Sequence, residues 1–188
     1  MTAFAKKLPL PLIVCIWLLN CNTVSDVTPT EGGDLDWARG IADGVVADLY
    51  DEGFVMYGVE ATNLDFSGFL YGGVQHPYWR FSYINPDFLV RVVVHPDGST
   101  TLTEDESYYE NEIEFTYTSA DVQNWLSLSS HCYRYITGCE DDVCYGLTGR
   151  CSDYGMTAFV TLYDQNLERL AWVTIDLESG LIDHFELL

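Results

Sequence analysis

Two neighbouring stretches of strict alternation constrain the fold of this chain more than any other feature of its sequence. Aromatic side chains occupy every second position in residues 79–83, and valines do so in residues 90–94. A period of two is typical of strands that bury one face. If residues 85–88 form the turn, all of these side chains lie on one face of an antiparallel hairpin. The predicted pairs are Trp79 with Val94, Phe81 with Val92, and Tyr83 with Val90.

The residues after the second stretch predict how the sheet continues. Pro96 and Asp97 suit the centre of a type I turn, and Gly98 suits the left-handed position that follows it. A loop of these residues places Leu102 opposite Val92, on the core face. A shift by one position would turn Leu102 outward. The turn chemistry and the hydrophobic pattern therefore agree on a third strand.

A helix is expected at residues 34–50, where apolar side chains recur at spacings of three and four. Asp34 is placed to cap its first turn. Gly40 and Gly44 lie on one side of this helix, where they would permit close approach to a sheet at some cost in helix stability.

Further elements follow along the chain. The Thr118-x-x-Asp121 pattern opens a second helix, expected to end near residue 129. The sequence Glu178-Ser179-Gly180 predicts a short turn that would pair Val173 with Phe185 and Leu177 with Leu181. We expect strands at residues 54–59, 113–117, 157–163, 170–177 and 181–187, a glycine-punctuated stretch at 69–74, and an acidic loop at 104–112.

This order of elements predicts an α+β fold, with two helices packed on antiparallel sheets of hairpins. Residues 34–188 are expected to form a single domain, and residues 34–117 and 118–188 are candidates for two helix-plus-hairpin halves that share one sheet. The segments 92–98 and 173–180 resemble the strand and Asp/Gly turn of PepSY-type or cystatin-like exported modules.

The formal net charge of −21 limits the partners that the chain can bind. A surface this acidic repels phosphate-rich polymers and anionic lipid head groups. We therefore expect no nucleic-acid partner and no direct electrostatic binding to membranes.

The N-terminal twenty residues have the charge order of a secretory signal. Lys6 and Lys7 precede an uncharged apolar run, residues 8–19, which is too short to span a bilayer comfortably. The motif Leu18-Leu19-Asn20-Cys21 resembles a bacterial lipobox. The resemblance implies that residues 1–20 are a cleaved signal peptide and that Cys21 carries the lipid anchor.

This resemblance also implies a location. The residue after Cys21 is Asn22, which resembles the pattern of bacterial lipoproteins that are sorted to the outer membrane. The protein would then be an outer-membrane lipoprotein that faces the periplasm or the exterior. The alternative is cleavage after Ser25 and release as a soluble secreted protein. Residues 21–33 are polar and contain several breaking residues, so they are expected to form a flexible tether.

Export also explains a cluster of four cysteines in the last third of the sequence. Cys132, Cys139, Cys144 and Cys151 are separated by six, four and six residues. An even cluster in an exported chain indicates two disulfides. Zinc competes, but the cluster lacks the short Cys-x2-Cys pair that zinc sites use. Three pairings remain open; the nested one, Cys132 with Cys151 and Cys139 with Cys144, would staple a loop that Gly138, Gly146 and Gly149 predict to be irregular.

One polar and aromatic patch is a candidate binding site. With the last hairpin paired as above, Trp172, Asp176 and His184 share the face opposite the core stripe. One large aromatic among polar residues is the composition of a modest ligand or protein contact. Large aromatic side chains are more often covered than exposed, so we expect the N-terminal or the second helix to cover Trp172, and the binding patch is the alternative.

The sequence lacks the local motifs of hydrolases, metalloproteases and phosphate-binding loops. The histidines are too scattered to indicate a metal site, so we expect no metal and no cofactor. The leading hypothesis is a non-enzymatic binding module for an envelope protein or glycan. The alternative is an envelope hydrolase that uses carboxylates in a cleft near the acidic loops.

Overall fold

The computed structural model describes residues 33–50, 53–71, 76–106, 115–138, 144–152, 155–164 and 166–188. For residues 144–152, 155 and 156 only the backbone is described. The predicted signal peptide, the tether up to residue 32 and Cys21 lie outside these ranges. The elements are α1 (Leu35–Leu49), β1 (Val55–Leu64), β2 (Trp79–Ile84), β3 (Phe88–Val94), β4 (Thr100–Glu106), α2 (Ser119–Thr137), β5 (Cys144–Ser152), β6 (Gly155–Tyr163), β7 (Arg169–Asp176) and β8 (Leu181–Leu187).

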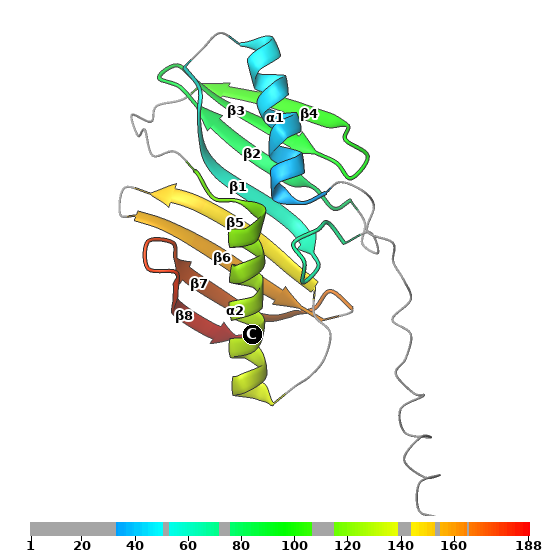
Figure 1. The fold of residues 1–188 in the computed structure, drawn as a ribbon, viewed down its shortest axis with the longest axis vertical. Coiled ribbons are helices and arrows are strands. Elements are labelled where there is room, and N and C mark those ends of the chain that lie inside the picture. Colours follow the sequence, from blue (N-terminus) through cyan, green and yellow to red (C-terminus); the bar gives the residue numbers. More distant parts are fainter. Residues whose placement is uncertain are drawn as a thin grey trace, which may run out of the picture.

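The strands form an antiparallel sheet in the order β4-β3-β2-β1-β5-β6-β7-β8. Each half of the described chain is a helix followed by four strands that pair in sequence order. The first strands of the two halves, β1 and β5, meet in the middle of the sheet. The α+β class and the two helices on antiparallel strands are thus confirmed (Figure 1).

The predicted register of the first hairpin is confirmed along its whole length, from Trp79 opposite Val94 to Tyr83 opposite Val90. Leu102 lies opposite Val92 as expected. Gly98 has a φ of 79°, which is the left-handed conformation that the turn requires. Turn chemistry and alternation together were sufficient here, because a slip by one residue would have exposed every aromatic side chain.

Both helices pack on the same face of the sheet (Figure 1). Helix α1 contacts β2 and β3, and α2 contacts β6 and β7. The largest fully buried side chains include Trp79, Phe81 and Leu126, and they fill the layer between the helices and the sheet. The opposite face of the sheet, which we call the open face, has no helix packed on it in the described ranges.

The N-terminal ends of the two helices also support each other. Asp34 caps α1 by accepting from the backbone N–H of Trp37 at 2.9 Å. Asp121 closes the first turn of α2 by accepting from the backbone N–H of Thr118 at 2.8 Å. Both caps follow the sequence pattern that predicted them. Ser119 Oγ then accepts from the backbone N–H of Asp36 at 2.8 Å, which ties the two helices together.

The segment between the halves departs from the prediction. Phe115 to Thr118 forms no strand, although its residues alternate. The backbone N–H of Phe115 donates to the carbonyl of Met56 at 2.7 Å, and Arg39 donates to the carbonyls of both Phe115 and Tyr117. The hydroxyl of Tyr117 donates to the carbonyl of Leu177 at 3.2 Å. Long-range contacts with α1 and β1 therefore occupy backbone groups that a strand would use.

Other expectations need correction. Gly40 and Gly44 face solvent, with no atom within 4 Å of a Cβ at either position, so they permit no close approach to the sheet. Helix α2 continues to Thr137 and ends at Gly138, whose φ is 68°. Residues 104–106 belong to β4 instead of a loop.

The final two corrections concern the second half. Gly146 and Gly149 lie inside strand β5, which pairs regularly with β6. This part of the predicted irregular loop is therefore a strand. Val173 does face Phe185, but a bulge after Thr174 pairs Asp176 with Leu181 in place of the predicted Leu177. The turn is one residue longer than the sequence suggested, because Gly180 closes it with a hydrogen bond to the carbonyl of Asp176.

Candidate functional site

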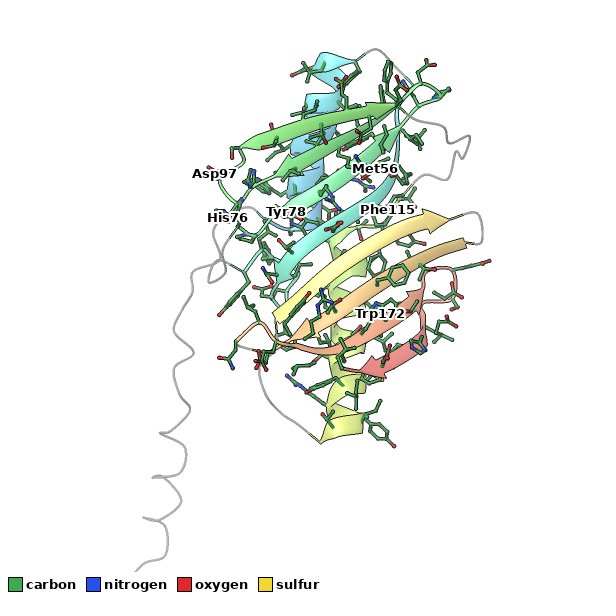
Figure 2. All side chains as sticks on the ribbon, turned by 180° about the vertical axis from the view of Figure 1, so that it is seen from behind. Met56, His76, Tyr78, Asp97, Phe115 and Trp172 are labelled. Atoms are coloured by element: carbon green, nitrogen blue, oxygen red, sulfur yellow. The ribbon has the colours of Figure 1, made fainter. Side chains whose placement is uncertain are left out.

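The open face of the second half carries a cluster of aromatic side chains (Figure 2). The rings of Phe159 on β6 and Trp172 on β7 stack, with centroids 5.8 Å apart and planes 23° apart. The ring of His184 on β8 meets Trp172 edge-on at 6.3 Å. We call these three residues the aromatic cluster. Trp172 remains 38% exposed although both Phe159 and His184 lie against its ring.

The register of three strands builds this cluster. Trp172 pairs with Thr161 and Glu186, and Thr174 pairs with Phe159 and His184. Side chains of residues paired on one face lie close enough to touch, directly or along the diagonal. The helix-side face of the same strands is filled by Val160, Val173 and Ile175, which fixes the orientation of the alternate residues toward the open face.

Polar groups surround the aromatic cluster. Glu186 lies next to His184, with Oε2 4.0 Å from Nε2, and both side chains are more than half exposed. Thr161 on β6 adds a half-buried hydroxyl group, whereas Thr174, on the same strand as Trp172, is buried. An exposed aromatic ring among hydroxyl and carboxylate groups offers stacking area together with hydrogen-bonding partners.

The open face of the first half has a different character. Arg80 pairs with Glu60, and Arg91 pairs with Asp105, so its charged side chains already have partners within the sheet. Ion pairs of this kind contribute little to stability when they are exposed. The contacting rings of the aromatic cluster lie in the second half, over β6, β7 and β8.

The structure separates the three residues of the predicted patch. Trp172 and His184 lie together, and the helices that were expected to cover Trp172 lie on the opposite face. Asp176 instead closes the last turn: it accepts from the backbone N–H of Glu178 at 2.9 Å and from the hydroxyl of Ser179 at 3.0 Å. These hydrogen bonds, that of Glu178 first, hold the pKa of the Asp176 carboxyl below its ordinary value.

Phe159 was not predicted as part of the site. The signal was present in the sequence, because Ala158, Val160 and Leu162 alternate as core residues and leave Phe159 on the other face. What the sequence could not supply was the pairing of β6 with β7, on which the stacking with Trp172 depends.

The cysteines are placed only in part. Cys132 lies on α2 with a half-buried, free thiol, and burial raises the pKa of that thiol. Cys139 lies outside the described ranges. Cys144 and Cys151 lie on β5, where only the backbone is described. The structure therefore does not show the predicted staple.

Described carboxyl groups with shifted pKa values act in turns. The pKa of Asp97 is lowered first by the hydroxyl of Ser99, and that of Asp164 first by the backbone N–H of Glu168. The donors that lower these pKa values lie within the same turns, so both carboxylates act there as turn-closing acceptors. Among the described residues, no group of three His, Cys, Asp or Glu is placed to hold a metal ion. No helix in these ranges is long and apolar enough to cross a membrane.

Comparison of the chain with protein-family models, with curated proteins and with solved structures found no match.

Proposed function

We propose that this protein is an exported lipoprotein of the outer membrane, anchored through Cys21, whose domain binds an envelope protein or glycan without catalysing a reaction. The binding surface is the open face of the second half, centred on the aromatic cluster. Residues 21–33 tether this domain to the membrane, and the lipid anchor is the only contact with the bilayer.

One observation carries the proposal: an exposed tryptophan on β7, on the sheet face that no described helix covers. Trp172 is 38% exposed yet held in place by the stacked ring of Phe159. Tryptophan supplies large contact area and loses little conformational entropy on binding, so it is enriched among residues that dominate binding energy. A solvent-facing sheet without such a role normally carries polar residues at this position.

Export also bears on the cysteines. We expect two disulfides in the native protein, since its compartment is oxidising. Cys144 and Cys151 lie seven positions apart on one strand, which separates their Cα atoms by roughly 23 Å and excludes a bond between them. The nested pairing and the pairing of Cys132 with Cys144 and Cys139 with Cys151 remain.

Intact mass spectrometry of the native protein, with and without reductant, tests the anchor and the disulfides. We expect a mass that begins at Cys21 with acyl chains attached and rises by about four hydrogens on reduction. A mass that begins after Ser25 would indicate a soluble secreted protein, and four free thiols would contradict the disulfides.

A comparison of two aromatic truncations tests the binding surface. Trp172→Ala removes the centre of the aromatic cluster, whereas Tyr135→Ala removes a ring from α2 that is 91% exposed and lies on the helix side. Chemical crosslinking to envelope fractions should fall more than about tenfold for Trp172→Ala and stay unchanged for Tyr135→Ala. Equal crosslinking by both variants would rule out the open face as the site.

A further inference from the structure

The C-terminal strand β8 is the edge of the sheet next to the aromatic cluster. It pairs with β7 on one side, and among the described residues no strand pairs with its other side. The backbone N–H of Leu188 donates to the carbonyl of Leu170 at 3.0 Å. Because hydrogen-bonded pairs alternate along an antiparallel ladder, the backbone groups of Phe185 and Leu187 point away from β7. They are available to a further strand.

The last residues of this edge, 185–187, are less protected than the other edge of the sheet, because the bulge of β8 falls before them, at Asp183, and Glu186 is their one charge. Natural edges are blunted by prolines, bulges or runs of charge. The other edge, β4, ends in Glu104, Asp105 and Glu106. Tyr50, the residue that caps the C-terminal end of α1, also donates a hydrogen bond to Glu104, which fastens β4 to the helix layer. By contrast, β8 exposes Leu181 and Leu187, which are 66% and 50% accessible.

The charge of the molecule limits what such a strand can be. Glu186 projects beside the β8 edge with its side chain 53% exposed, and among the described ion-pair contacts it meets only the imidazole of His184, at 4.0 Å. The arginines of the first half already pair with carboxylates. A cationic side chain next to β8 would therefore meet the Glu186 carboxylate, and beyond it the face of Trp172.

A second copy of the chain fits this edge less well. Two copies joined through β8 would each bring a formal net charge of −21 to the interface. Repulsion between like charges of this size opposes such a dimer. A cationic partner is instead attracted to this edge, because the net charge of the protein is negative.

We infer that β8 takes up an extended, cationic segment of a partner protein as a ninth strand, with alternate Arg or Lys side chains beside Glu186 and alternate apolar side chains beside Leu187. This inference rests on the proposed function and specifies its partner as a protein instead of a glycan. Main-chain hydrogen bonds to Phe185 and Leu187 supply affinity, and the alternation of side chains supplies specificity.

A synthetic peptide of about ten residues that alternates Arg and Val is the probe. Added to the isotopically labelled exported protein, it should slow amide exchange at Phe185 and Leu187 by about tenfold or more and leave Thr100 on β4 unchanged. A peptide that alternates Glu and Val, and an Arg-Val peptide with alternate amides methylated, should not bind. Binding of the methylated peptide with equal affinity would overturn strand addition.

Two protein variants separate the backbone from the charge. Leu187→Pro removes an outward N–H without removing a hydrogen bond to β7, and Thr100→Pro makes the matched change on β4. Glu186→Lys reverses the charge at an exposed side chain and preserves the backbone. We expect Leu187→Pro and Glu186→Lys each to weaken binding of the Arg-Val peptide about tenfold, and Thr100→Pro to have no effect. Unchanged binding by Glu186→Lys would overturn the cationic preference even if Leu187→Pro fails to fold.

The inference about strand β8 can be wrong while the proposed function is right, and the experiments distinguish the two. If Trp172→Ala loses envelope crosslinking while Leu187→Pro and Glu186→Lys retain it, the open face binds its partner and the strand addition is wrong. Concentration-dependent protection of Leu187 without peptide would identify a second copy as the occupant and would also overturn the inference.

Discussion

Tyr83 shows how a single polar group is accommodated in the layer between sheet and helix. Its ring belongs to the core stripe of β2, and its hydroxyl donates to Asp43 Oδ1 on α1 at 2.6 Å. Burial, and next the hydrogen bond to Asp43, raises the pKa of the Tyr83 phenol well above its ordinary value. The neutral phenol is the form that donates this bond, so the folded protein retains the proton more strongly than the unfolded chain does.

Removing this hydroxyl tests the bond. Tyr83→Phe should lower the free energy of unfolding by about 1 kcal/mol at pH 7. Because the pKa is raised in the folded state, the contribution is fully present below the unfolded value near 10 and is lost as the pH rises toward the folded value. Urea unfolding at pH 7 and above pH 10 should show the difference shrink. Tyr135→Phe, at an exposed ring, is the control; Tyr83→Phe with wild-type stability at pH 7 would refute this account.

At the scale of elements, α1 and the turn after β3 place glycine for different reasons. Gly98 has a φ of 79°, and a Cβ there would lie 3.7 Å from both Ile41 and Trp37. That distance is ordinary contact, so the left-handed backbone is what requires glycine. Gly40 and Gly44 are exposed in a regular helix and have no such requirement.

The two kinds of glycine should respond oppositely to alanine. Gly40→Ala should raise the free energy of unfolding by about 0.5–1 kcal/mol, since alanine favours a helix interior. Gly98→Ala should lower it by about 1–2 kcal/mol through the left-handed strain. Chemical denaturation of both variants checks this. A loss of stability in Gly40→Ala would mean that α1 needs a small residue there after all.

The linker between the halves depends on Arg39. Its guanidinium donates to the carbonyls of Phe115 and Tyr117 and lies 6.0 Å from the ring of Phe115. Arg39→Met keeps most of the apolar stem and leaves those carbonyls without this donor. We expect a loss of about 2 kcal/mol in the free energy of unfolding, the size of hydrogen bonds to a charged group. Arg91→Met, which breaks an exposed ion pair on β3, should cost less than about 1 kcal/mol; equal losses would contradict the linker role.

At the scale of the whole molecule, local patterns predicted the hairpins and failed where distant segments meet. Trp79 to Val94 paired as expected because alternation and turn residues act within twenty positions. Phe115 is part of an alternating pattern that is typical of a strand, but its backbone N–H donates to the carbonyl of Met56 on β1. Whether Trp172 is covered depends on which face of the sheet the helices pack against. Its contact with Phe159 depends on how β6 pairs with β7. The residues next to these positions in the sequence do not determine any of these three contacts.

The acidic surface makes a prediction about salt. A formal net charge of −21 destabilises the compact state through self-repulsion, which salt screens. The melting temperature should rise by several degrees between about 0.01 M and 0.15 M sodium chloride, where the screening length falls from about 30 Å to 8 Å. Calorimetry at constant pH measures it. A melting temperature that stays level or falls would show that the charges are arranged without net repulsion.

The most direct test of the binding surface is oxidative footprinting of Trp172 in the protein alone and in the protein mixed with its envelope fraction. The account predicts that envelope material protects Trp172 from oxidation while Tyr135, on the opposite side of the molecule, is labelled equally in both samples. Equal labelling of Trp172 in the two samples would contradict the account.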